Sequence, residues 1–101
     1  MPEMNVQVRW PDGRLQDCYS PSLVMHDHLT AGTDYAVADF VARSRAALHE
    51  ASERVRSRYG FACTSAMATL DDIERRAAHF ADASAMVTVV AMKPALPAVT
   101  R

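Results

Sequence analysis

Residues 4–13 read MNVQVRWPDG, and this stretch decides the fold. Every second residue from Met4 to Trp10 is apolar, and the residues between them are polar. Successive side chains leave a strand on opposite sides, so this alternation predicts a strand with one buried face. Asp12-Gly13 supplies the positive φ that a tight hairpin needs, and Pro11 marks where the strand stops donating ladder hydrogen bonds. The sequence therefore predicts an N-terminal β-hairpin.

A second strand is predicted over Arg14 to Tyr19, with Cys18 and Tyr19 on opposite sides. From Leu23 to Asp34 the pattern dissolves into apolar, polar and loop-forming residues in turn. A loop of this length is uncommon in so small a domain, and such loops are often functional or mobile.

Helical periodicity then begins. Apolar residues recur at intervals of three and four from Val37 to Tyr59, with charged residues on the other face. This predicts a helix of about 23 residues. Gly60 lies just past the last periodic position, where a left-handed C-cap is expected.

A second helix is predicted to begin near Thr64 or Ser65 and to bury an apolar stripe that ends at Phe80. The alternative start has Thr69 as its N-cap. The apolar run from Ala85 to Met92 is too short for a typical helix and predicts a strand covered on both sides. Its two faces are predicted to carry Met86, Val90 and Met92 on one side and Val87 and Val89 on the other.

The predicted class is α+β with the order β-β-α-α-β. Three strands form a mainly antiparallel sheet, two helices pack on one face, and the last strand lies beside the first. Residues 1–92 are expected to form one domain, and residues 93–101, which contain prolines, a disordered tail.

Composition narrows the functional class. The net charge of −1 over 101 residues argues against nucleic-acid binding, and no apolar run approaches the length of a membrane helix. The first residues do not resemble a signal peptide. We therefore expect a cytoplasmic protein in which Cys18 and Cys63 are reduced.

The strongest candidates for a ligand site are Cys18, His26, His28 and Cys63. Thiolates and neutral imidazoles bind zinc or iron, and the two histidines lie on the long loop. The cysteines are isolated rather than paired, so buried or solvated side chains are the more common interpretation, and no cofactor is predicted. Cys63 alone could act as a nucleophile with a histidine as base, but the sequence holds no complete catalytic set.

Arginines gather on the first predicted helix, among them Arg54, Arg56 and Arg58. Such a surface can grip phosphates or carboxylates. Glu50, however, stands four residues before Arg54, which is the spacing of an ordinary surface ion pair. We interpret this surface as a solvated helix face.

Four strings carry a family resemblance: VRWPDG at residues 8–13, DCYSPSLV at 17–24, DFV at 39–41 and RYGFAC at 58–63. They resemble a small bacterial family of nitrogen-starvation response proteins first noted in mycobacteria, and the resemblance runs from about Met1 to Met92. Genes of that family tend to lie beside those for a nitrilase, a radical-SAM protein, an acetyltransferase, a flavoprotein and a synthase-like enzyme.

The resemblance implies a role in scavenging nitrogen from nitriles or cyanide, or in making a nitrogenous small molecule. It brings no catalytic residues. One expected function is a non-catalytic accessory subunit, which forms a homodimer or binds an enzyme of the nitrilase gene cluster. The alternative is a small enzyme or carrier that uses Cys18, His26, His28 or Cys63.

Overall fold

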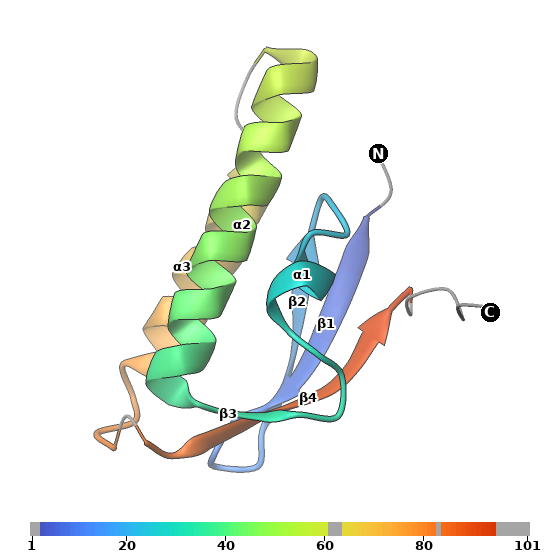
Figure 1. Ribbon diagram of the computed structural model, residues 1–101. Coiled ribbons are helices and arrows are strands. Elements are labelled where there is room, and N and C mark those ends of the chain that lie inside the picture. The colour runs from blue at the N-terminus through green and yellow to red at the C-terminus, as the bar shows by residue number, and fades with distance from the viewer. Residues whose placement is uncertain (1–2, 61–63, 83, 95–101) are drawn as a thin grey trace, which may run out of the picture.

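A computed structural model describes residues 3–60, 64–82 and 84–94. Within these residues a four-stranded antiparallel sheet is covered on one face by three helices (Figure 1). The elements in chain order are β1 (Met4–Arg9), β2 (Leu15–Ser20), α1 (Met25–His28), β3 (Asp34–Ala36), α2 (Val37–Tyr59), α3 (Thr64–Ala77) and β4 (Met86–Lys93). The predicted α+β class is confirmed.

β1 and β2 form the predicted hairpin and pair antiparallel along their whole length. The Gly13 amide donates to the Trp10 carbonyl at 2.8 Å, and the Trp10 amide donates to the Arg14 carbonyl at 2.9 Å. This is the pattern of a three-residue hairpin loop closed by a glycine bulge, and Gly13 has the positive φ that it requires, +87°. Every second side chain from Met4 to Trp10 is at most 2% exposed, as the alternation predicts.

β4 pairs antiparallel with β1, which confirms that the last strand lies beside the first. The register between them shifts by one residue. Val8 faces Val89, whereas Gln7 faces Ala91, so Val90 is an extra residue without an opposite partner. Such a β-bulge reverses the alternation of inward and outward side chains beyond it.

The bulge decides which residues of β4 are buried. Met92 is 4% exposed and lies on the core side with Val87 and Val89. The sequence-based prediction placed Met92 on the other face with Met86 and Val90. It was wrong for Met92, because it did not foresee the extra residue at the bulge. β4 is also not covered on both sides, because Met86 and Val90 are 48% and 37% exposed.

The predicted number of three strands is wrong by one. Asp34–Ala36 forms β3, which pairs antiparallel with β4 and gives the sheet order β2-β1-β4-β3. The segment from Leu23 to Asp34, predicted to be a loop, also contains the single helical turn α1, so the described residues hold three helices instead of two. Neither added element is long enough to show a periodicity of its own.

α2 has the predicted boundaries, and α3 begins where predicted but ends earlier. Gly60 ends α2 in the left-handed conformation at a φ of +85°, and its amide donates to the Arg56 carbonyl at 2.8 Å. α3 begins at Thr64, the earlier of the two predicted starts. It ends at Ala77, so Phe80, predicted as the last residue of the helical stripe, lies beyond the helix and packs against the core from there.

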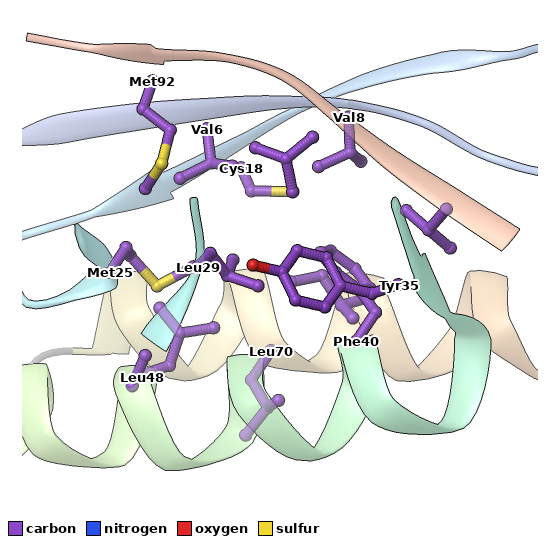
Figure 2. Packing of buried hydrophobic residues seen from close by; sticks show 14 of the residues in the cluster. Val6, Val8, Cys18, Met25, Leu29, Tyr35, Phe40, Leu48, Leu70 and Met92 are labelled. Carbon is purple, nitrogen blue, oxygen red and sulfur yellow. The ribbon is translucent and has the colours of Figure 1, made fainter. Parts of the chain in front are cut away.

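The core fills the space between the sheet and the helices. Figure 2 shows Val6 and Met92 of the sheet facing Met25 and Leu48 of the helical layer.

Trp10 closes the hairpin end of this core. Its ring meets Phe40 edge-on, with centroids 5.5 Å apart, and stacks on Phe80 at 5.7 Å. Its indole N–H donates to Gln16 Oε1 at 2.8 Å. Trp10 therefore packs as part of the core at the hairpin end.

Candidate functional site

Cys18, the first of the four predicted ligand residues, lies on β2 with its side chain between the sheet and the helices (Figure 2). It is 1% exposed. Burial, aided by the charge of the neighbouring Asp17, raises the pKa of its thiol to about 12. A thiol that is protonated at neutral pH and covered by core residues is a poor nucleophile and a poor metal ligand.

His26 and His28 both lie on α1 and are partly exposed. His26 Nε2 is 2.9 Å from the Pro94 carbonyl oxygen, and His28 Nε2 is 3.2 Å from Glu50 Oε1 on α2. Arg54 donates to the other carboxylate oxygen of Glu50 at 3.0 Å. The hydrogen bond to His28 is the main cause that lowers the pKa of the Glu50 carboxyl. Both imidazoles therefore attach α1 to neighbouring segments.

Cys63, the fourth candidate, lies outside the described residues. Within the described part of the chain, no group of three or more His, Cys, Asp or Glu side chains could hold a metal ion. Cys18, His26 and His28 thus do not form such a group among themselves. A zinc or iron site that includes Cys63 stays a prediction.

Among the described residues, four arginines of α2 form ion pairs at the surface: Arg43, Arg45, Arg54 and Arg56. Arg54 pairs with Glu50 at 3.0 Å, and Arg45 pairs with Glu74 of α3 at 2.7 Å. These are exposed ion pairs, each of which contributes little to stability. Their geometry fits the interpretation of this surface as a solvated helix face.

The face of the sheet opposite the helices is open and carries exposed apolar side chains. β4 is an inner strand of the sheet, and it presents the exposed Met86 and Val90 on this face with Thr88 between them. Leu15 on β2 is 51% exposed on the same side. Apolar side chains of β4 and β2 therefore share this face with Asn5, Gln7 and Arg9, which the other inner strand, β1, presents on the same side.

Charged residues lie among these apolar side chains. Arg9 and Asp34 lie directly beside Thr88 on the two strands that flank β4. Thr88 Oγ1 donates to Asp34 Oδ1 at 2.5 Å. Asp17 of β2 and Lys93 of β4 lie nearer the other end of the face. The strand residues of this face thus combine exposed apolar side chains of β4 with charges of both signs and with the polar Asn5 and Gln7 of β1.

A separate hollow lies where the hairpin loop meets the end of α3. It has a volume of about 370 Å³ and is lined by Trp10, Asp12, Arg14, Arg76, His79 and Phe80. A neighbouring hollow of about 360 Å³ shares Arg76 and His79 with it. Sequence reasoning missed this place because the two segments that form it are far apart in the chain. Helical spacing gave no signal either, because α3 ends at Ala77 and His79 lies beyond it.

These features define a small two-layer α+β protein with one uncovered sheet face. Residues 5–92, well over half of the chain, match the family model described as nitrogen starvation-induced protein NitG. The chain belongs to this family, which confirms the resemblance to nitrogen-starvation proteins. Among curated proteins and solved structures, none is significantly similar to it. No helix in the described ranges is long and apolar enough to cross a membrane.

Proposed function

We propose that this nitrogen starvation-induced protein is a non-catalytic binding subunit, and that it acts through protein contacts made by the open face of its sheet. The observation that supports this proposal is the exposed pair Met86 and Val90 on the inner strand β4. An antiparallel sheet that faces only water normally presents polar side chains on that face. Exposed apolar side chains that lie among polar and charged ones are instead common in specific protein interfaces.

The occupant that the face fits is a second copy of the chain. A two-fold contact sets the same surface against itself, so the surface must be self-complementary. The open face carries Arg9 and Lys93 as well as Asp17 and Asp34. A two-fold axis near Val90 can therefore bring cations of one copy to anions of the other, while the apolar side chains meet.

The test replaces Val90, which is exposed on this face and contributes nothing to the core, by lysine. The dimer would lose two buried valine side chains, about 1–2 kcal/mol each, so the dissociation constant should rise about a hundredfold. Ala46→Lys, on the exposed side of α2, is the matched control and should leave the dimer unchanged. Analytical ultracentrifugation at micromolar concentration measures the dimer dissociation constant of the wild type and of the two variants. A monomeric wild-type chain would overturn the dimer.

The resemblance supports a second partner, an enzyme of a nitrilase-associated nitrogen-scavenging pathway. The same variants serve in a co-purification experiment with the neighbouring nitrilase. If the open face makes this contact, the wild type and Ala46→Lys retain the enzyme and Val90→Lys does not. Retention by all three would place the contact elsewhere on the protein. Retention by none, together with a monomeric wild type, would remove the support for a binding subunit.

A further inference from the structure

We infer that the hollow between the hairpin loop and the end of α3 is a binding site for a small planar organic carboxylate that carries one negative charge. This inference is independent of the dimer, because the hollow lies at the helical side of the hairpin and uses none of the residues of the open sheet face.

Charge favours an anion in this hollow. Asp12 is already engaged by Arg14, with its Oδ2 3.6 Å from the Arg14 Nε and its Oδ1 accepting the Arg14 amide at 3.0 Å. The side chains of Arg76 and His79 make no hydrogen bond or ion pair with any of the described residues. The guanidinium of Arg76 therefore has no ion-pair partner in this hollow, although Asp17 and Asp72 line the hollow on its other side. A guanidinium binds a carboxylate through two parallel hydrogen bonds, and a histidine three residues further on can add a third donor.

The neighbouring hollow, on the other side of Arg76, is unfavourable for an anion because it contains carboxylates. That hollow is lined by Asp17 and Asp72, and its other arginine, Arg75, is occupied by Asp71 and Asp72. An anion there would meet two carboxylates. The hairpin side of Arg76 has no such excess of acid and is the favourable place for a negative charge.

Shape and lining define the rest of the ligand. Phe80 is half-buried and stacks on Trp10 with an angle of 6° between their planes. Because Trp10 is only 2% exposed, Phe80 supplies the accessible aromatic wall of the hollow. Ligands with planar rings pack well on such walls. A volume of about 370 Å³ lies in the range of sites for small molecules. One guanidinium without an ion-pair partner suits a single carboxylate better than a phosphate dianion.

The experiment titrates the full-length protein with sodium benzoate and follows it by heteronuclear NMR. The sequence has one tryptophan, so the indole N–H of Trp10, which donates to Gln16 in the neighbouring hollow, gives a single resonance that reports on this region. We expect saturable shifts of this resonance and of the Arg76 and His79 amides. Benzamide, the neutral analogue, should bind at least tenfold more weakly.

Arg76→Gln should weaken benzoate binding at least tenfold, while Arg75→Gln, the neighbouring arginine that is already paired with aspartates, should change it less than twofold. His79→Gln is a second variant, with an expected loss of severalfold. The absence of a saturable shift, equal binding of benzamide, or wild-type affinity in Arg76→Gln would overturn the site. Inorganic phosphate that binds as tightly as benzoate would overturn the carboxylate class.

Discussion

The thiol of Cys18 should be almost unreactive in the folded protein. The perturbation that isolates it is Cys63→Ser, which leaves Cys18 as the only thiol of the chain. Its pKa of about 12, against an ordinary value of 9.0, lowers the thiolate fraction at neutral to mildly alkaline pH about a thousandfold. At 1% exposure the sulfur is also covered by its neighbours, which slows attack further.

The assay follows the absorbance of an aromatic disulfide reagent mixed with Cys63→Ser at about pH 8. The same protein unfolded in urea gives the reaction rate of an accessible Cys18 thiol. The folded protein should react at least about a thousandfold more slowly. If folded Cys18 reacts within about tenfold of the unfolded rate, the thiol is accessible and ionisable, and its assignment to the core is wrong.

The raised pKa of Cys18 has a consequence for stability. Because the pKa is higher in the folded state, the stabilisation is complete below the ordinary thiol pKa and is lost as the pH rises above it. Between about pH 8 and pH 10.5 the loss amounts to about 2 kcal/mol. Cys18→Val removes this group but keeps every other titrating residue. The free energy of unfolding of the wild type should therefore fall more steeply with pH than that of the variant, and parallel curves would refute the argument.

Two further substitutions test the helices. Gly60→Val should lower the free energy of unfolding by about 1–2 kcal/mol, and the melting temperature by several degrees, because a valine is strained at a φ of +85°. The loss comes from the backbone conformation, since a Cβ at this position meets no atom of the described residues within 4 Å. Gly60→Asn, which tolerates this conformation better, should lose less, and equal losses in thermal denaturation would argue against the cap. Ser44→Ala should be neutral or stabilise by up to about 1 kcal/mol, since the buried Ser44 hydroxyl has no hydrogen-bond partner within the described residues. A clear loss of stability in urea denaturation would show that this hydroxyl is paired.

Periodicity over many residues made most of the fold predictable. The alternation from Met4 to Trp10 and the interval pattern of α2 each repeat often enough to name the element and its buried face. Gly13 and Gly60 fixed two boundaries because each sits where only a positive φ fits. β3 was missed because three residues cannot repeat a pattern. Met92 was misplaced because a bulge at Val90 depends on the pairing with β1 and leaves no mark in the sequence of β4.

The candidate sites were harder to predict from the sequence than the fold was. Cys18 was chosen for its chemistry, but the alternation of β2 turns its thiol into the core. Arg76 and Trp10 meet at one hollow only because α3 packs on β2, which is a tertiary event. The apolar residues of the open face were visible in the sequence. Their position on an inner strand followed only from the order of the sheet.

The sheet order also governs how the protein can be made. The first strand and the last strand, β1 and β4, are the two inner strands, and Asn5 pairs with Lys93. A ribosome releases the chain from its N-terminus, so the hairpin and helices α1, α2 and α3 emerge before the strand that joins β3 to β1. Until β4 is made, the sheet is incomplete and the apolar side chains of β1 and α2 cannot be fully buried. Folding must therefore wait for a contact between distant parts of the chain. A chain whose synthesis stops before β4 would therefore lack an inner strand of the sheet. We expect it to stay unfolded and to be recognised by chaperones and proteases.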